Sequence, residues 1–318
     1  MFLYKVCYLY SQGENVEMKL IIQIPCYNEE KNLEKVIKNL PTQIEGIEKI
    51  EYMVINDGST DKTREIAIKN NVNYLVDVYP NKGLANTFTT GIDECLKNGA
   101  DIIVNIDGDN QYPGYEIPRL VKPIVENRAD IVIGERQIEK FSPIKRILQR
   151  IGSKMVRIVS KTKVPDAPSG FRAYSRECAL KLNVYNKFTY TLETLVQAGA
   201  NKTKIETIKI ESFPNTRKSR LFKNIPQYIY KSSANIIKAL FIYKPIKMWA
   251  IASLVSLVCS ILSFIKMGTK AILPYVFLII AVQFAIASMQ SIAVQANRNN
   301  LEKIQYFVKK ERYEKNEK

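Results

Sequence analysis

The sequence predicts an α/β domain with a mostly parallel, doubly wound sheet, followed by a hairpin of two transmembrane helices. Over the first half of the chain, short apolar runs alternate with helical stretches of about ten residues or more, which is the pattern of βαβ units. Beyond residue 247, the ranges 248–265 and 271–296 contain no charged residue, and each is long enough to cross a bilayer.

The individual elements follow from the spacing of apolar residues. Strands are predicted where short apolar runs end at turn residues, at 19–24, 52–55, 73–78, 102–106, 129–134 and 203–210. Helices are predicted where apolar residues recur every three or four positions, at 28–40, 61–70, 84–98 and 188–199. A basic segment rich in Ile and Val covers 145–159, and a loop is expected at 166–171.

The shift in composition near residue 247 sets the expected domain organisation. We expect an extension without assigned function at 1–17, the α/β domain at 18–220, amphipathic juxtamembrane helices at 221–247, two transmembrane helices at 248–296 and a basic tail at 297–318. Basic residues are frequent on both sides of the uncharged ranges, which favours a multi-pass protein of the cell membrane whose domain and tail are cytoplasmic. Two lysines in the short loop, Lys266 and Lys270, do not reverse this preference.

Charge and composition exclude several classes of function. The chain of 318 residues has a formal charge of +16, but it shows no zinc-finger spacing, RNA-recognition signature or Arg-rich arm, so no nucleic-acid partner is expected. Anionic lipid near the uncharged ranges explains the basic residues better. The absence of histidine excludes Ser-His-Asp triads and His-ligated zinc, which leaves acid–base and metal chemistry to carboxylates. The five scattered cysteines lack C-x-x-C spacing and are expected to be reduced thiols.

Polar clusters follow three of the predicted strands. They are P-C-Y-N-E-E from Pro25, N-D-G-S-T-D from Asn56 and D-G-D-N-Q from Asp107. One such cluster is ordinary turn chemistry. Three at the same edge of one sheet indicate a binding site, because ligands of doubly wound sheets bind beyond the carboxyl ends of the strands.

The clearest chemical signal is the pair Asp107 and Asp109. Two carboxylates with one residue between them can hold a divalent cation that bridges the oxygens of a diphosphate, and the cation then offsets charge on a leaving nucleoside diphosphate. Taken alone, the pair is equally compatible with a polar turn, since turns favour these residue types.

The other two clusters have a binding and a structural interpretation each. Asp57 can accept a base N–H or a ribose hydroxyl, or it can serve a turn and a helix cap. Pro25 and Tyr27 can form the walls of a base site, or they can pack at the end of a strand. Glu29 is also suited to the N-terminus of a helix. The order and spacing of the clusters together, and no single residue, point to a site.

Further motifs extend this order along the chain. They are N-K-G-L-A from Asn81, I-G-E-R from Ile133, D-A-P-S-G-F-R from Asp166 and T-R-K-S-R-L-F-K from Thr216. With the three clusters, they resemble the family 2 glycosyltransferases of GT-A fold, particularly dolichol-phosphate mannose synthase and bacterial polyprenyl-phosphate glycosyltransferases. The resemblance covers roughly residues 18–245, and the hairpin after S-R-L-F-K is also similar to the bacterial members.

The resemblance implies roles for individual residues. Those expected to bind the nucleotide-sugar are Pro25, Tyr27, Glu29, Asp57, Lys82 and Asp107. Those expected to hold Mg²⁺ or Mn²⁺ are Asp107, Asp109 and Gln111. Those expected near the acceptor phosphate are Arg136, Arg146, Ser169 and Arg217. Asp107, Asp109 and Arg217 are the expected catalytic residues. A solvated surface charge or a lipid headgroup contact remains the alternative for each arginine.

Three departures from the family pattern bear on these roles. Asn56 replaces the first carboxylate of the usual D-D-G-S, which leaves the base-contacting Asp57 intact. Gly108 replaces the usual Ala between the two carboxylates, which should be harmless. The processive members carry a Gln-x-x-Arg-Trp signature, whereas this chain has a single tryptophan, Trp249, near the membrane boundary. Chain polymerisation is therefore not expected.

The function expected from these features is an inverting, non-processive hexosyl transfer. One sugar would pass from a GDP- or UDP-linked donor to a polyprenyl-phosphate lipid at the cytoplasmic face of the membrane. An ionised phosphate needs no strong base, which suits a site without histidine. The alternatives are transfer to a hydroxyl of a lipid-linked saccharide in surface polysaccharide assembly, which requires an Asp or Glu base, and a non-catalytic membrane scaffold. A dinucleotide-dependent oxidoreductase is disfavoured, because the first strand lacks a following Gly-rich turn.

Overall fold

The computed structural model describes residues 18–137, 143–184, 190–213, 234, 237, 238 and 240–314. The chain forms two compact units, one of Met1–Arg220 with Val308–Lys318 and one of Leu221–Phe307. Most of the predicted juxtamembrane range 221–247, together with Arg217, lies outside the described residues.

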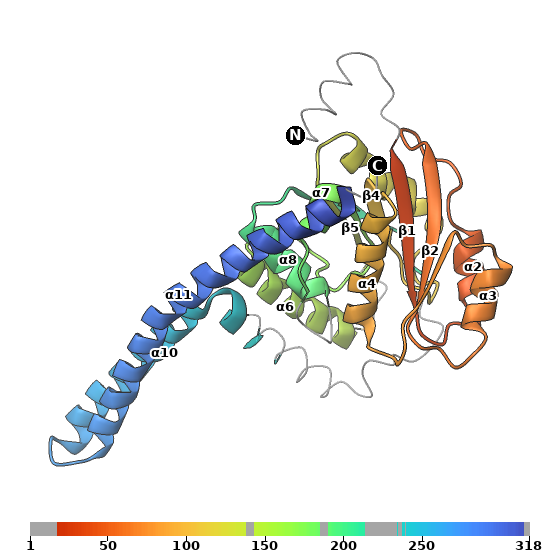
Figure 1. Ribbon diagram of the computed structural model, residues 1–318. Coiled ribbons are helices and arrows are strands. Elements are labelled where there is room, and N and C mark those ends of the chain that lie inside the picture. Colours follow the sequence, from red (N-terminus) through yellow and green to blue (C-terminus); the bar gives the residue numbers. More distant parts are fainter. Residues whose placement is uncertain are drawn as a thin grey trace. The chain divides into compact units, whose positions relative to one another are not determined.

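The first unit is built on a seven-stranded sheet with the order β3-β2-β1-β4-β6-β5-β7. Strands β1 and β2 lie side by side in Figure 1. The strands are β1 Lys19–Cys26, β2 Lys49–Asn56, β3 Tyr74–Asp77, β4 Ile102–Asn105, β5 Ile131–Glu135, β6 Arg172–Ser175 and β7 Ile205–Lys209. Neighbouring strands are parallel except where β6 pairs antiparallel with β4 and β5. The predicted mostly parallel α/β sheet is confirmed, and the antiparallel β6 is an addition that the apolar pattern did not indicate.

Helices cover both faces of this sheet. They are α2 Leu33–Lys38, α3 Thr63–Lys69, α4 Leu84–Lys97, α5 Ile117–Val125, α6 Pro143–Ser160, α7 Arg176–Lys181 and α8 Thr191–Ala200, with a short 3-10 turn at Gly114–Glu116. Alternate residues of β1 point to opposite faces. Leu20 and Ile22 share one hydrophobic core with α2, α3 and α5. On the other face, Phe88 of α4 stacks on Tyr190, which precedes α8.

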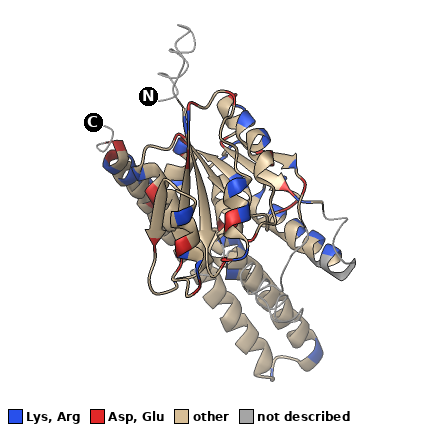
Figure 2. Ribbon diagram, turned by 90° about the vertical axis from the view of Figure 1, so that its right-hand side faces the viewer, with Lys and Arg blue, Asp and Glu red and all other residues tan. Residues whose placement is uncertain are grey.

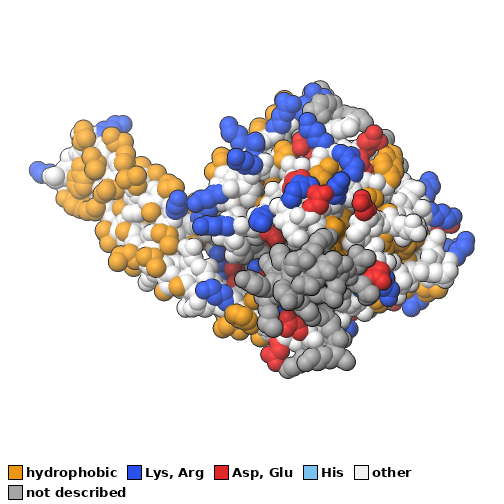
Figure 3. All heavy atoms as spheres, turned by 90° about the horizontal axis from the view of Figure 1, so that it is seen from above, with side chains coloured by type: hydrophobic (Ala, Val, Ile, Leu, Met, Phe, Trp, Pro, Cys, Tyr) orange, Lys and Arg blue, Asp and Glu red, His pale blue; other side chains and the backbone are white. Residues whose placement is uncertain are grey.

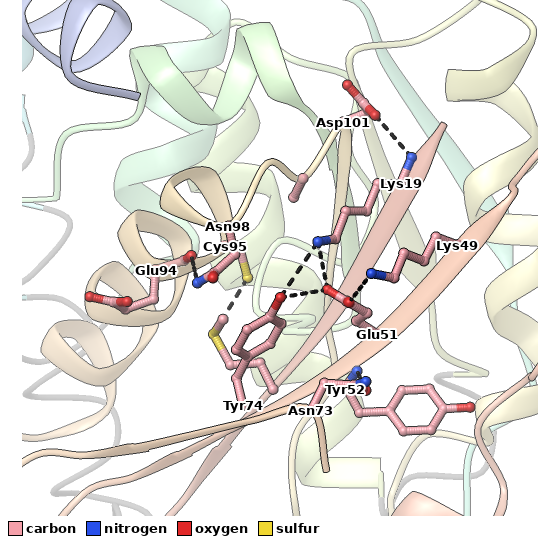
Figure 4. A network of polar contacts seen from close by, with 12 residues as sticks. Lys19, Lys49, Glu51, Tyr52, Asn73, Tyr74, Glu94, Cys95, Asn98 and Asp101 are labelled. Atoms are coloured by element: carbon pink, nitrogen blue, oxygen red, sulfur yellow. Dashed lines mark hydrogen bonds and ion pairs between the residues drawn. The ribbon is translucent and has the colours of Figure 1, made fainter. Parts of the chain in front are cut away.

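A polar network ties together the amino ends of β1, β2 and β3, away from the predicted site (Figure 4). Glu51 is 5% exposed, and its carboxylate lies 2.7 Å from the Lys19 ammonium and 2.8 Å from that of Lys49. The Tyr74 hydroxyl donates to the same carboxylate at 2.7 Å. Asp101 accepts a hydrogen bond from the Lys19 backbone N–H at 2.9 Å. Three strands and the segment that precedes β4 are therefore joined at this edge.

The second unit is dominated by two helices that are long and apolar enough to cross a membrane. They are α10 Pro245–Met267 and α11 Leu273–Glu314, whose most apolar windows have mean hydropathies of 2.2 and 2.0. Uncharged residues cover most of this hairpin (Figure 2), and hydrophobic side chains gather on its surface (Figure 3). Helix α11 continues past residue 296 without interruption, so the predicted tail is helical as far as Glu314.

Serine side chains join the two helices of the hairpin. Ser253 donates to the Ala281 carbonyl at 2.8 Å, and Ser260 donates to the Pro274 carbonyl at 2.8 Å. A third bond runs from Ser288 to the Ile246 carbonyl at 3.0 Å. Small hydroxyl side chains let helix backbones approach closely and satisfy polar groups within an apolar environment. The predicted helical hairpin is therefore held by specific polar contacts as well as by packing.

Candidate active site

The strand register brings the three predicted polar clusters to one edge of the sheet. Cys26 at the end of β1 is opposite Asn56 at the end of β2, and Gln23 is opposite Asn105 at the end of β4. The residues that follow these strands therefore emerge side by side. Gly108 shows how close they are, because a Cβ built there would lie 2.7 Å from Cys26 Sγ. Glycine at position 108 therefore suits this structure, because a larger residue would fit only if Cys26 moved.

Asp107, at the centre of this edge, has one carboxylate oxygen without a hydrogen bond. Its Oδ1 is shielded from solvent and has no hydrogen-bond partner among the described residues. Burial, and then repulsion from Asp109, raise the pKa of Asp107 to about 7, against the opposing attraction of Arg136. A cation placed between Asp107 and Asp109 would relieve both the missing contact and the repulsion.

Asp109 and Gln111 face each other within one turn. The Gln111 backbone N–H donates to Asp109 Oδ1 at 3.2 Å, and the Gln111 side-chain amide donates to the other carboxylate oxygen. Among the described residues, no group of three or more Cys, Asp or Glu has metal-binding geometry. Mg²⁺ is commonly held by one or two carboxylates, with phosphate oxygens and water completing its shell. The two carboxylates of Asp107 and Asp109, with the side-chain carbonyl of Gln111, are a set of oxygen donors that fits this mode of binding.

Asp57 positions the loop before α4. Its Oδ1 accepts the Lys82 backbone N–H at 2.8 Å, and its Oδ2 accepts that of Gly83 at 2.9 Å. The residue is 3% exposed, whereas the Lys82 side chain is exposed. Each carboxylate oxygen retains a second lone pair, so a base N–H could still be accepted. Asp57 therefore has a structural role that differs from the expected turn and helix cap, and its nucleoside contact stays a prediction.

The remaining residues of the first cluster differ in their accessibility. Tyr27 is 40% exposed, while Pro25 is buried. Glu29 is 6% exposed, its carboxylate accepts the Asn32 side-chain amide at 3.2 Å, and its backbone N–H donates to the Thr63 hydroxyl at 2.8 Å. Tyr27 is thus the member of this cluster that presents a ring surface to a ligand.

Arg136, predicted near the acceptor phosphate, is held by a carboxylate that the sequence did not single out. Its guanidinium makes a bidentate pair with Asp166, with bonds of 2.8 Å from Nε and 3.0 Å from the second terminal nitrogen. The Arg136 backbone N–H also donates to Asp166, at 3.1 Å, and Gln149 of α6 donates to the same carboxylate at 2.5 Å. Bidentate pairing fixes the plane of a guanidinium. Arg136 is therefore oriented before any ligand binds.

The other residues predicted near the acceptor phosphate, Ser169 and Arg146, differ in their burial and in the element that holds them. Ser169 is fully buried in the loop that follows Asp166. Arg146 lies on α6 and is half-buried. Their predicted contacts with an acceptor are not tested by this geometry.

Arg172 organises the loop from Asp166 to Phe171, and it had no assigned role in the sequence. It is fully buried and donates to the carbonyls of Ser169 at 2.8 Å and Ala167 at 2.7 Å. It also donates to Thr191 and Thr194 at the start of α8, at 3.1 Å to the Thr191 carbonyl and 2.7 Å to the Thr194 hydroxyl. Its positive charge also acts on Asp107, whose pKa it lowers against the larger effect of burial.

Gly170 brings this loop against Asp107. Asn105 donates to the Gly170 carbonyl at 2.9 Å and to the Tyr190 hydroxyl at 3.0 Å, which fixes the glycine beside the end of β4. A Cβ at position 170 would lie 2.8 Å from the Tyr190 hydroxyl and 3.0 Å from Asp107 Oδ2. The position therefore requires glycine for the loop to reach the carboxylate.

A protein-family model supports what the geometry suggests. The model described as "Glycosyl transferase family 2" matches residues 21–182, which include all three clusters and the Arg172 loop. The chain belongs to glycosyl transferase family 2. The resemblance noted from the motifs is therefore confirmed at the level of the family.

Curated relatives in this family come from several archaea. An uncharacterized protein of Methanocaldococcus jannaschii is 30% identical over 203 residues, which are 61% of this chain and 81% of that protein. A dolichol-phosphate mannosyltransferase of Pyrococcus furiosus is 32% identical over 197 residues, covering 58% of this chain and 54% of the relative. A UDP-N-acetylglucosamine–dolichyl-phosphate N-acetylglucosaminyltransferase of Methanococcus voltae is 27% identical, covering 59% and 83%.

Solved structures support the fold of the family 2 domain. Glucosyl-3-phosphoglycerate synthase of Mycobacterium tuberculosis, in a complex with Mn²⁺, UDP and phosphoglyceric acid, superimposes with a TM-score of 0.57 at 19% identity. The match covers 70% of this chain and 78% of that one. At this identity the likeness establishes the GT-A fold alone, which confirms the predicted fold class.

Proposed function

We propose that the protein transfers a single sugar from a GDP- or UDP-linked donor to a polyprenyl-phosphate lipid at the cytoplasmic face of the membrane, with inversion at the anomeric carbon. The observation that carries this proposal is the charged edge of the sheet, where Asp107 Oδ1 has no hydrogen-bond partner among the described residues and Asp109 repels the same carboxylate. The proposal draws further support from the two apolar helices of the same chain, because they suit an enzyme whose acceptor lies in a bilayer.

The donor half of the proposal rests on the carboxylate pair and on the relatives. Asp107, Asp109 and Gln111 would hold Mg²⁺ or Mn²⁺, whose charge stabilises a leaving nucleoside diphosphate. The exposed ring of Tyr27 would stack on the base, and Asp57 would accept one of its N–H groups. The printed name of the Methanococcus voltae relative includes a UDP-linked sugar, which supports a nucleotide-sugar as donor.

The acceptor half rests on the arginines and on the absence of histidine. A polyprenyl phosphate is ionised near neutral pH, so its oxygen can attack the anomeric carbon without a strong base. Arg136, held in plane by Asp166, would orient that phosphate, together with Arg146, Ser169 and Arg217. The names of two relatives specify dolichol-phosphate or dolichyl-phosphate transfer, which agrees with a lipid phosphate acceptor.

The test is a transfer assay with the full chain in lipid nanodiscs. Radiolabelled nucleotide-sugars are screened with polyprenyl phosphate as sole acceptor, in the presence of Mn²⁺ or Mg²⁺. We expect label to enter the lipid fraction as a single-sugar product, and Asp109→Asn to lower the rate by about 100-fold or more, as loss of electrostatic stabilisation does at such sites.

Two results would contradict the proposal. Transfer only to a lipid-linked saccharide would support the alternative acceptor, a sugar hydroxyl, and would require a carboxylate base. No binding of any nucleoside diphosphate in the presence of Mn²⁺, measured by calorimetry, would support a non-catalytic scaffold.

A further inference from the structure

Helix α6 exposes a row of apolar side chains. Ile147, Ile151, Met155 and Ile158 are exposed by 57%, 57%, 39% and 61%. Their spacing of four, four and three residues places them along one side of the helix. A row of this length is unusual for a surface helix, because apolar residues that recur at helical spacing normally face a core.

The core-facing side of α6 is a different one. Gln149, Ser153, Val156 and Val159 are buried, and α6 packs against α8 through this inner side. The exposed row therefore belongs to the outside of the first unit and does not form part of its core.

Basic side chains run beside the exposed row. Arg150, Lys154 and Arg157, at helical spacings of four and three residues, are exposed, and so is Lys161, directly after the end of α6. No Asp or Glu occurs from residue 143 to residue 165. We call the exposed apolar row and these four cations the α6 outer face. A helix with apolar and cationic residues on its exposed side has the composition of helices that lie in a membrane interface.

We propose that the α6 outer face lies on the membrane surface, with its apolar row among the lipid headgroups and its cations on anionic lipid. Charge complementarity favours this occupant, because each Lys or Arg near an anionic leaflet contributes about 1 kcal/mol. A second copy of the same face is disfavoured, since it would oppose four cations with four cations and offer no carboxylate. The same chain also contains two helices that are long and apolar enough to cross a membrane, which agrees with a lipid partner.

This contact would connect the lipid surface to the proposed acceptor site. Gln149 lies on the inner side of α6 and donates to Asp166 at 2.5 Å, and Asp166 in turn holds the Arg136 guanidinium. One helix therefore presents lipid-binding residues outward and supports the acceptor arginine inward. This link rests on the proposed function, whereas the membrane contact of α6 does not.

Tryptophan fluorescence tests the contact directly, because Trp249 is the only tryptophan of the chain. In a Trp249→Phe background, Ile151→Trp reports on α6. Ile68→Trp is the matched control, since Ile68 is 52% exposed on α3, which packs on the opposite face of the sheet. Each protein is placed in nanodiscs that contain anionic phosphatidylglycerol and phosphatidylcholine brominated along its acyl chains. Met155→Trp provides a second reporter if Ile151→Trp lowers the thermal stability.

We expect bromine to reduce the emission at position 151 about two-fold, because the apolar side of an interfacial helix lies roughly 5–10 Å into the headgroup and acyl boundary. Emission at position 68 should be unchanged. Replacing Arg150, Lys154 and Arg157 with Gln should weaken the quenching at position 151 in anionic nanodiscs. Equal quenching at 151 and 68 would overturn the proposal. So would a blue shift at 151 without quenching, since protein would then cover the face.

The outcome is independent of catalysis. Quenching at position 151 in a protein that transfers no sugar would support the membrane contact and contradict the proposed function. Sugar transfer by a protein that shows no quenching at 151 or 155 would support the function and overturn the membrane contact.

Discussion

Gly170 separates the Tyr190 hydroxyl from the Asp107 carboxylate, and this position leaves no space for a side chain. Gly170→Ala would place a Cβ 2.8 Å from that hydroxyl and 3.0 Å from Asp107 Oδ2. We expect transfer activity to fall at least tenfold, because small displacements of a positioned group strongly reduce the rate. The free energy of unfolding should fall by about 1–3 kcal/mol, as is usual for overpacking. Initial rates and thermal unfolding measure the two effects.

Gly152 provides the control for this substitution. It lies within α6, where an added Cβ would have no atom within 4 Å. Gly152→Ala should leave activity unchanged and stabilise the protein slightly, by up to about 1 kcal/mol, since alanine is the better helix former. If Gly170→Ala behaves like Gly152→Ala, the close approach of the loop to Asp107 has no functional role.

Arg172 is expected to position the loop and not only to stabilise the fold. Arg172→Met leaves buried carbonyls of Ala167 and Ser169 without their donor, and each unpaired group destabilises by roughly 1–3 kcal/mol. Arg176→Met is matched to it, because buried Arg176 also donates to two carbonyls, those of Leu96 and Ala100. Both variants should lower the unfolding temperature, but only Arg172→Met should lower kcat of the folded protein. Equal kcat values would reduce Arg172 to a structural residue.

Arg217 is expected to act on the acceptor and not on the donor. Arg217→Gln should lower transfer to polyprenyl phosphate by about 10- to 100-fold, because a hydrogen bond to a charged group contributes about 1.5–3 kcal/mol. Binding of the nucleoside diphosphate should be unaffected. Lys218→Gln removes the same charge one residue away and serves as the control. If the Arg217 variant transfers sugar at an unchanged rate, Arg217 does not bind the acceptor phosphate.

The role of a single residue could be predicted from the sequence only where it depends on neighbouring residues in the chain. Asp107 and Asp109 follow a strand directly, so their position at the sheet edge could be inferred from the alternation of elements. Arg172 and Asp166 could not be assigned in this way, because their partners are backbone carbonyls and side chains from other elements. A fully buried arginine leaves no periodic signal in a sequence. The only available sign was its place in the D-A-P-S-G-F-R motif.

Among the elements, the network around Glu51 predicts how stability depends on pH. Burial raises the pKa of Glu51, but hydrogen bonds from Lys19, Lys49 and Tyr74 outweigh it, so the pKa lies below its ordinary value of 4.5. A carboxyl whose pKa is lowered by folding contributes stability above its unfolded value, and that contribution is lost as the pH falls through its folded value. Glu51 should therefore stabilise the joined strands above about pH 4.5 and lose this effect below it.

Thermal unfolding of Glu51→Gln measures this contribution. At pH 7 the variant should be less stable by about 1–3 kcal/mol, because hydrogen bonds to charged donors are lost, and the difference should shrink below pH 4. Glu34→Gln is the control, since Glu34 and Lys38 form an exposed pair on α2, with side chains 41% and 66% exposed. Exposed pairs contribute little, so this variant should remain close to the parent protein. A pH-independent difference for Glu51→Gln would contradict the assignment.

The elements themselves were predicted unevenly. A strand that is buried on both faces of the sheet appears in the sequence as a run of apolar residues. The predictions for β1, β2 and β4 agree with the structure within three residues at either end. The four-residue strand β6, Arg-Ala-Tyr-Ser, has no such run, because its buried residues include an arginine. Helix α6 was read only as a basic segment, since its exposed apolar row obscures the usual contrast between an apolar and a polar side. Its surface and its inner side could be distinguished only in three dimensions.

At the scale of the whole molecule, the proposed orientation makes a simple prediction. In intact cells, a cysteine introduced at Thr269, in the turn between α10 and α11, should react with a membrane-impermeant maleimide. A cysteine at Glu311, near the end of α11, should react only after permeabilisation. The parent protein gives the labelling background, to which Cys26, Cys95 and Cys178 should contribute little, because burial raises their pKa values. The reverse labelling pattern would place the domain outside the cell.

The tight turn of the hairpin bears on how this protein enters its membrane. Only five residues, Gly268 to Ile272, separate α10 from α11, and serine hydrogen bonds already join the two helices. If the domain stays on the side of synthesis, translocation involves little more than this turn, which contains Lys270, and the adjacent Lys266. Residues 18–220 precede the hairpin in the chain and can begin to fold before α10 leaves the ribosome, whereas Val308–Lys318, which complete the first unit, follow the hairpin. Membrane insertion would then precede the last step of domain folding, in which the end of α11 returns to the first unit and Lys309 pairs with Asp93.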